Sequence, residues 1–425
     1  MKFADEYLAK QVRQENLIKE TPAKNLNYIA VIPAFNESGL NKSLDSLYRA
    51  VRPSYPVEVI IVINWPFNSM ADVVKKNHEI KKKADEWAKA RNQDSLRFHT
   101  VTAEPDSEKK SGVGYARKIG MDEAVRRFNR VNSREGIILS LDADVEVNDH
   151  YFLELEKHFE RFPSTTGCST YFEHPLDQAD NEDIRQAIIQ YELHQRYYIQ
   201  SLRYAGHPNV FHTVGSAFAV KTEAYCLQGG MNARKAGEDF YFLQKLFDLG
   251  NFTECNTAHV YPSPRPSERV PFGTGPVVLD YLVSKKDLLS FNTESFEILK
   301  QFIEVGEELY ESVKNDDWSF LEQLHPLMKK YLEINDIEAR LKEIHENSGD
   351  SIAFRKRFYR WFNMFRMLKF LNFGKSSFPD MPVRNATLKL LEKKKITPVK
   401  NDSESLLIQM RDIERNNPAN PPLQQ

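Results

Sequence analysis

Cysteine, net charge and long apolar runs are all scarce in this 425-residue sequence, and each scarcity excludes a class of protein. The three cysteines are far apart and odd in number, which predicts neither a disulfide framework nor a cysteine metal site and favours a reducing cytoplasm. Lysine and arginine together number 58 against 60 aspartates and glutamates, so the chain as a whole is no partner for nucleic acid. No apolar run reaches about 18 residues, and the N-terminus lacks the pattern of a signal peptide. We therefore expect a cytoplasmic protein, at most peripheral on the cytoplasmic face of a membrane.

Short apolar runs that alternate with helical patterns are the main feature of the first part of the chain. Strands are predicted at Ile29–Ile32, Val57–Ile63, Leu96–Val101 and Gly136–Leu141, with amphipathic helices between them. Continuous apolar strands separated by helices are typical of a mainly parallel sheet that is covered on both faces. The sequence therefore predicts an α/β fold, in which ligands bind at the carboxyl ends of the strands.

The alternation ends at a proline-rich stretch near residue 262, and the sequence changes character after it. A chain of this length can form more than one core. We expect an N-terminal helical extension at 1–26, the α/β domain at 27–275, a helical region at 276–415 and a disordered tail at 416–425, which has three prolines and several amides.

Two carboxylates follow the fourth predicted strand, at Asp142 and Asp144. In an extended segment, residues i and i+2 point the same way, so both carboxylates can reach one ion. Hard oxygen ligands suit Mg²⁺ or Mn²⁺, ions that also accept phosphate oxygens. The alternative is that the two acids only solvate a turn at the strand end.

A second motif, Lys110-Ser111-Gly112-Val113-Gly114-Tyr115-Ala116-Arg117, suits a phosphate. Glycine lets the backbone approach an anion closely, and a helix N-terminus presents free N–H groups to it. Lys110 and Arg117 can add charge-assisted hydrogen bonds. A solvated loop is the alternative, because Gly-x-Gly alone is a weak signal.

Four segments in this order resemble the GT-A glycosyltransferases of family 2, over roughly residues 27 to 275. They are Ala30-Val31-Ile32-Pro33-Ala34-Phe35-Asn36-Glu37, the glycine- and arginine-bearing motif, Asp142-Ala143-Asp144, and Gly229-Gly230-Met231-Asn232 with Gly237-Glu238-Asp239. The resemblance implies a GT-A catalytic domain that binds a nucleotide sugar.

The resemblance also assigns roles to single residues. Pro33, Ala34 and Phe35 would line the base, and Glu37 would meet the base or ribose. Asp239 would be the general base, with Glu238 ordering the acceptor pocket. Capping of a helix N-terminus is the alternative for these two acids. One position departs from the family, because Asn64 follows the second strand where an acid is usual, and its amide could bond a base edge.

Three further side chains are candidates near the end of the domain. His259 could complete the metal site, since neutral imidazole is a common ligand, although a lone histidine is more often structural. Arg265 and Arg269 lie on a proline-stiffened loop and could clamp a diphosphate once it closes. A charged surface loop is the alternative for them.

These patterns predict an enzyme that moves a sugar from a nucleotide-diphosphate sugar to an acceptor hydroxyl, with Mn²⁺ or Mg²⁺ as cofactor. The acceptor would be a saccharide or glycoconjugate, and inversion at the sugar carbon is implied by the resemblance. Two alternatives stay open: a sugar-phosphate nucleotidyltransferase, and a non-catalytic module that binds a sugar or nucleotide. A basic aromatic stretch at 354–373 could also lie on an anionic membrane surface, or else pack onto the main domain.

Overall fold

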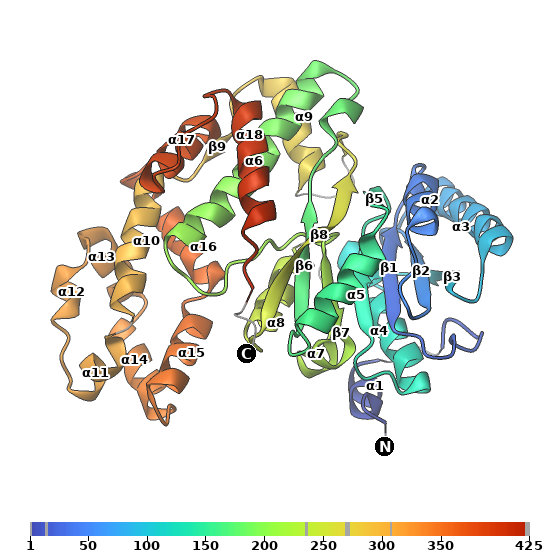
Figure 1. The fold of residues 1–425 in the computed structure, drawn as a ribbon, viewed down its shortest axis with the longest axis horizontal. Coiled ribbons are helices and arrows are strands. Elements are labelled where there is room, and N and C mark those ends of the chain that lie inside the picture. Colours follow the sequence, from blue (N-terminus) through green and yellow to red (C-terminus); the bar gives the residue numbers. More distant parts are fainter. Residues whose placement is uncertain (1, 13–15, 234–236, 268–272, 307, 421–425) are drawn as a thin grey trace. The chain divides into compact units, whose positions relative to one another are not determined.

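The computed structural model describes residues 2–12, 16–233, 237–267, 273–306 and 308–420. Among these, eight strands form one sheet in the order β3-β2-β1-β4-β7-β6-β8-β5 (Figure 1). Four neighbouring pairs are parallel and three are antiparallel, so the sheet is mainly parallel, as predicted. The strands are β1 Tyr28–Ala34, β2 Val57–Asn64, β3 Leu96–Ala103, β4 Ile137–Ser140, β5 Val145–Val147, β6 Gly167–Phe172, β7 Phe218–Lys221 and β8 Phe252–Pro262.

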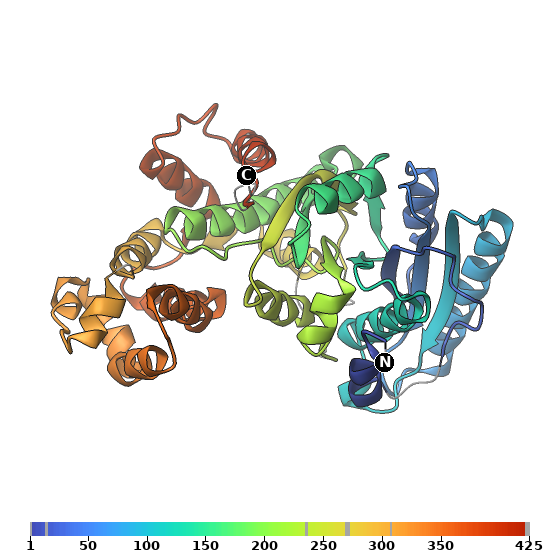
Figure 2. The same ribbon diagram turned by 60° about the horizontal axis from the view of Figure 1, so that its bottom comes forward.

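Helices cover both faces of this sheet, and Figure 2 shows α3 and α4 on opposite sides of strands β1 to β3. One face packs against α2, α3 and α5 in a core that contains Leu44, Trp87 and Phe152. On the other face, Gly120 of α4 lies so close to Val31 and Val62 that a Cβ would clash with both. The helices of this unit are α1 Asp5–Gln11, α2 Leu40–Arg49, α3 Ala71–Arg91, α4 Val113–Val131, α5 Tyr151–Arg161, α7 Thr222–Leu227 and α8 Glu238–Phe247.

The strands form where the sequence places continuous apolar residues. All seven residues of β1 and all eight of β2 are buried, and most of them are valine, isoleucine or alanine. Branched side chains pack well on a pleated surface that is covered on both sides. The carboxyl ends of β1, β2 and β4 therefore meet at one edge, where the polar residues after each strand are brought together.

The chain divides into two compact units. The first holds the sheet and comprises residues 1–180, 213–276 and 414–425, and the second comprises 181–212 and 277–413. Helix α6, although it precedes β7 and β8 in the sequence, belongs to the second unit, and α9 runs from the first into the second. The elements concerned are α6 Glu182–Tyr204, α9 Thr274–Ser284, β9 Leu289–Ser290, α10 Thr293–Val305, α11 Leu309–Lys314, α12 Phe320–Gln323, α13 Pro326–Ile334, α14 Ile337–Glu346, α15 Ser351–Trp361, α16 Met364–Phe373, β10 Met381–Pro382, α17 Val383–Lys393 and α18 Ser403–Asn416.

The basic aromatic stretch at 354–373 forms α15 and α16 of the second unit. Phe358 and Phe362 are fully buried, and their rings lie 5.9 Å and 4.9 Å from that of Phe302. The aromatic face thus serves the core of the helical unit itself. Nowhere in the described ranges does a helix have both the length and the apolar character needed to cross a membrane.

Candidate active site

The turn after β1 is fixed by buried polar contacts. Pro33 and Ala34 pair with Val62 and Ile63 of β2, so they lie level with the end of that strand, where Asn64 is buried. The backbone N–H of Asn36 donates to Oδ1 of Asn77 at 2.9 Å. Phe35 packs against the core beside this turn. The residues predicted to line a base therefore stand together at the carboxyl edge of the sheet.

Glu37 ends this turn and is buried, which is unusual for a carboxylate unless it has partners. Its Oε1 accepts a hydrogen bond from the backbone N–H of Gly39 at 2.8 Å, just before α2 begins. Its Oε2 forms an ion pair with Nη2 of Arg265. Glu37 is thus held in place from both sides and cannot turn freely toward solvent.

Asp142 and Asp144 lie in the turn that joins β4 to β5. This differs from the extended segment expected from the sequence, because the N–H of Val145 bonds back to the carbonyl of Asp142 at 3.3 Å. Each carboxylate meets an arginine: Nη2 of Arg117 lies 2.9 Å from Oδ1 of Asp142, and Nη2 of Arg265 lies 3.1 Å from Oδ2 of Asp144. The turn therefore presents two half-exposed carboxylates that attract cations.

Arg117 is buried and bonds groups of the protein itself, whereas the sequence suggested that it would contact a phosphate. Its Nε donates to Glu238 at 3.2 Å, and its Nη1 donates to Ser140 Oγ at 2.6 Å and to the carbonyl of Gly215 at 2.9 Å. Burial by itself lowers the pKa of Arg117, but Asp142, Glu238 and Asp239 outweigh it and raise the pKa further. The guanidinium is fully used inside the protein, where it joins the Asp-x-Asp turn to α8.

Glu238 and Asp239 open α8 behind Gly237, whose φ of +70° is a backbone conformation that glycine adopts without strain. Glu238 is buried against Arg117, whereas Asp239 is only partly buried and accepts a hydrogen bond from the N–H of Phe240 at 2.7 Å. Burial and the neighbouring Glu238 raise the pKa of Asp239 to about 6, against the opposing pull of Arg117. A carboxylate with such a pKa is suited to accept a proton near neutral pH.

Gly215 is a site residue that no sequence motif indicated. A Cβ at this position would lie 2.8 Å from Oδ2 of Asp239 and 3.0 Å from Nη2 of Arg117. Only the absence of a side chain lets the segment pass this close to both groups. The signal was invisible in the sequence because Gly215 is far along the chain from the residues that it meets.

The glycine-bearing motif lies at the same edge. Gly112 precedes α4 with a φ of +91°, and Oγ of the neighbouring Ser111 accepts from the N–H of Phe67 at 2.9 Å, which joins the loops after β2 and β3. Lys110 forms an exposed ion pair with Asp106 at 2.6 Å. Exposed ion pairs of this kind contribute little to stability, so the ammonium of Lys110 can leave Asp106 and bind a ligand.

His259 lies apart from the Asp-x-Asp turn because of the register of β5 and β8. These strands are antiparallel, and the carbonyl of His259 accepts from the N–H of Asn148, four residues beyond Asp144. Four residues of strand span about 13 Å. Its Nε2 lies 3.0 Å from the carbonyl of Asn256, and burial lowers the pKa of its imidazole. The structure does not bring this histidine to the two aspartates.

The side chains around Asp142 and Asp144 decide whether the divalent cation predicted from the sequence fits this site. The part of the chain that the structure describes contains no group of three or more His, Cys, Asp and Glu residues placed to hold an ion. Mg²⁺, however, is commonly held by one or two carboxylates while substrate phosphates and water complete its shell. Asp142 and Asp144, each already facing a cationic side chain, fit that kind of site, and His259 has no place in it.

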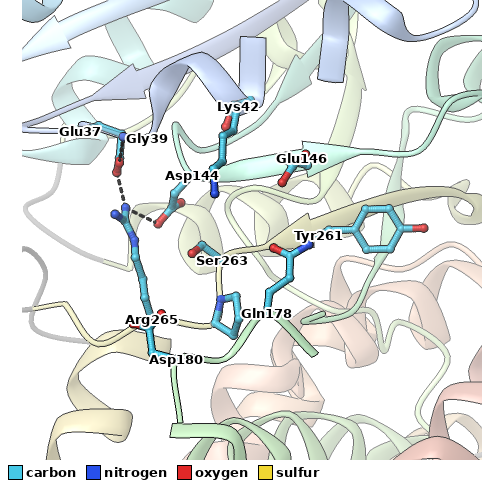
Figure 3. Close-up of a pocket in the computed structure, with 12 residues that line it drawn as sticks. Glu37, Gly39, Lys42, Asp144, Glu146, Gln178, Asp180, Tyr261, Ser263 and Arg265 are labelled. Carbon is cyan, nitrogen blue, oxygen red and sulfur yellow. Dashed lines mark hydrogen bonds and ion pairs between the residues drawn. The ribbon is translucent and has the colours of Figure 1, made fainter. Parts of the chain in front are cut away.

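A cavity of about 580 Å³ opens beside Asp144 (Figure 3). Arg265 spans it by reaching both Glu37 and Asp144, and Arg269 lies outside the described residues. Several lining residues were not foreseen from the sequence, because they lie in or next to α2, β5 and β8 and in the segment after β6. They are Gly39, Lys42, Ser43, Glu146, Gln178, Asp180, Tyr261, Ser263 and Pro264.

Comparison with known proteins gives structural neighbours only. No protein-family model and no curated protein matches the sequence. Residues 1–349 of TarS from S. aureus in complex with UDP-GlcNAc align with a TM-score of 0.40 and 13% identity, over 79% of this chain and 90% of that one. The complex of the same protein with UDP gives 0.38 and 13%, over 80% and 93%, and a mycobacterial protein gives 0.31 and 17%, over 63% and 79%.

The sheet and its helices confirm the α/β class that the sequence predicted, a mainly parallel sheet with helices on both faces and a helical C-terminal region. At these identities and TM-scores the neighbours say nothing of activity. The function is therefore inferred from the geometry of the site itself.

Proposed function

We propose that this protein is a glycosyltransferase that uses a nucleotide-diphosphate sugar and a divalent cation, Mn²⁺ or Mg²⁺. The observation that supports it most is the junction at Arg117, which joins Asp142 of the Asp-x-Asp turn to Glu238, next to Asp239. A carboxylate suited to hold a metal and a carboxylate suited to accept a proton thus occupy one edge of the sheet. Transfer of a group from a metal-bound diphosphate to a hydroxyl needs both.

The donor would lie along the carboxyl ends of β1, β2 and β4. Pro33, Ala34, Phe35 and Asn64 would receive the base, and the N-terminus of α4 at Gly112, with Lys110, would face the phosphates. Asp142 and Asp144 would hold the cation, which neutralises charge on the departing nucleoside diphosphate. Arg265 would exchange its contact with Asp144 for a phosphate oxygen when the donor arrives.

The acceptor would lose its proton to Asp239 as its oxygen attacks the sugar carbon. One bond forms between that oxygen and the sugar carbon, and the bond from this carbon to the diphosphate oxygen breaks. Attack on the face opposite the leaving group inverts the configuration. Glu238, held beside Asp239 by Arg117, helps raise the pKa of Asp239 to about 6, at which the base is ready near neutral pH.

A donor screen tests this proposal. The full chain is incubated with nucleotide sugars, UDP-GlcNAc among them, and with Mn²⁺ or Mg²⁺, while donor hydrolysis and binding are followed. Release of a nucleoside diphosphate supports the transferase. Release of pyrophosphate from a nucleoside triphosphate and a sugar phosphate would instead show a nucleotidyltransferase, and saturable binding without turnover, unchanged in Asp239→Ala, a binding module.

Asp144→Ala is expected to abolish metal-dependent release of the nucleoside diphosphate, at least about 100-fold, because the cation would lose a carboxylate. Chelator should inhibit the wild type to a similar degree, and added Mn²⁺ should restore it. Asp149, an exposed loop residue near the same strand, provides the control Asp149→Ala. Wild-type turnover that continues unchanged in excess chelator would rule out the metal.

Gly215→Ala is expected to lower turnover about 10- to 100-fold, because the new Cβ displaces Asp239 or Arg117 and small misplacements of reacting groups are costly. The change is measured as kcat with saturating donor. Gly349→Ala, at a position where a Cβ meets nothing within 4 Å, is the matched control. Full activity in Gly215→Ala would show that the close approach has no part in catalysis.

Two features of the proposal concern where the protein acts. All three cysteines are free, which fits a reducing cytoplasm. Phe354, Phe358 and Phe362 are buried in the helical unit, so contact of 354–373 with a membrane would rest on its basic side chains and its partly exposed residues. Binding to anionic vesicles against neutral vesicles measures that contact directly.

A further inference from the structure

Lys42 lies in the first turn of α2 and lines the cavity beside Asp144. Figure 3 shows its ammonium group pointing from the helix toward the carboxylate of Asp144. The next residue, Ser43, is buried, and its Oγ donates to the carbonyl of Ala143 at 2.9 Å. The first turn of α2 is therefore fastened to the Asp-x-Asp turn itself, and Lys42 is held next to it.

Lys42 differs from the other cationic side chain of the cavity in its ion pairs. Among the described residues, the carboxylates that line the cavity are those of Glu37, Asp144, Glu146 and Asp180, and the cationic side chains are Lys42 and Arg265. Arg265 is bound to Glu37 and Asp144, whereas Lys42 forms no ion pair with any residue that the structure describes. Gly39, where α2 starts, has no side-chain cap, so the positive end of the helix dipole adds to the same side.

We infer that Lys42 is a ligand of the donor diphosphate, which it contacts from the α2 side while Arg265 contacts it from the β8 side. This inference rests on the proposed function. An ammonium offers three donors and compact charge, and an anion that replaces the contact between Arg265 and Asp144 would lie between the two cations. Both cations would stabilise the charge that grows on the diphosphate as the bond to the sugar breaks. The alternative is that Lys42 is a solvated side chain that only balances the negative charge of the nearby carboxylates.

The test compares Lys42→Met and Lys42→Arg with the control Lys76→Met, an exposed lysine on α3. Dissociation constants of UDP, GDP, UMP and GMP are measured with Mg²⁺ on the full chain, together with kcat for donor hydrolysis. Lys42→Met should raise the dissociation constant of the nucleoside diphosphate that the wild type binds by about tenfold or more. It should raise the dissociation constant of the corresponding monophosphate less, and it should lower kcat. Lys42→Arg should recover most of the affinity, and Lys76→Met should equal the wild type.

The outcomes separate this inference from the proposed function. A wild type that binds and hydrolyses a nucleotide sugar, with Lys42→Met equal to it, overturns the role of Lys42 and leaves the transferase intact. Equal weakening of diphosphate and monophosphate also overturns it, because the effect would then be general electrostatics. If the wild type binds neither UDP nor GDP, both conclusions fall. Thermal unfolding of Lys42→Met should match the wild type, since the side chain is exposed.

Discussion

Asp239→Asn is expected to reduce sugar transfer by about 10²- to 10⁴-fold, the usual contribution of a general base. The amide keeps the size and the hydrogen bond from the N–H of Phe240 but cannot accept the acceptor proton. The measurement is kcat for transfer with saturating donor. Binding of the donor should change little, because in the proposed mechanism this carboxylate would contact the acceptor and not the diphosphate.

The same group predicts the pH dependence. Since the pKa of Asp239 is raised to about 6, kcat of the wild type should fall about tenfold for each pH unit below 6, as the base becomes protonated. The free energy of unfolding depends on pH in the opposite direction to kcat. A raised carboxyl pKa stabilises the fold below the unfolded value of 3.8, and this contribution is lost as pH rises through about 6. The Tm of Asp239→Asn, relative to the Tm of the wild type, should therefore be higher at pH 8 than at pH 5.

Asp149→Asn is the control for both measurements, because this exposed aspartate lies in the loop after β5 and has no part in the proposed chemistry. Transfer at an undiminished rate in Asp239→Asn would exclude this residue as the base. A low rate accompanied by a large loss of Tm at pH 8 would mean instead that the carboxylate supports the fold.

Arg117→Met is expected to destabilise the protein by about 3–5 kcal/mol, because it leaves the buried carboxylate of Glu238 without compensating charge. Arg117 meets Asp142 and Glu238 and also bonds Ser140 and the carbonyl of Gly215, so four partner groups lose a donor or a charge at once. Turnover should also be lost, since the Asp-x-Asp turn and α8 would no longer be held together. Denaturant unfolding of the ligand-free protein provides the measurement.

This experiment decides between two roles of Arg117. A phosphate ligand would leave the stability of the free protein nearly unchanged and would raise the KM for the donor. Arg130→Met, at an exposed arginine in the last turn of α4, is the matched control. The double variant Arg117→Met/Glu238→Gln should recover part of the lost stability, because it removes one of the uncompensated charges. Unchanged stability in Arg117→Met would restore the phosphate role.

The strands around the site could be predicted because their signal is local. Continuous branched and apolar residues at 57–63 can satisfy burial on two faces only in a covered parallel strand, and β2 forms there, Val57–Asn64. The same holds for β1 and β4, and thus for the edge at which Asp142 and Asp144 appear. The start of α8 at Glu238 and Asp239 was also visible, since Gly237 and two acids mark a helix N-terminus.

The partners of charged side chains could not be predicted in the same way. Arg117 looked like a phosphate residue from its motif, yet its partners at 140, 142, 215 and 238 meet it only after the sheet has formed. His259 looked like a metal ligand from its place near a strand end, yet the antiparallel register of β5 and β8 sets it level with Asn148. Register and long-range packing decide such contacts, and neither leaves a periodic trace in one sequence.

By itself the sequence determined which segments become strands, that their polar ends share one edge, and that Asp142 and Asp144 lie there, because burial and backbone preference act over a few residues. Glu238 and Asp239 were assigned to the site only by the family resemblance. Tertiary structure alone decided that Arg117 binds carboxylates, that Gly215 passes beside Asp239, and that Lys42 lies next to Asp144. These contacts join residues up to 121 positions apart. Their free energy depends on distance in space, which only the folded chain sets.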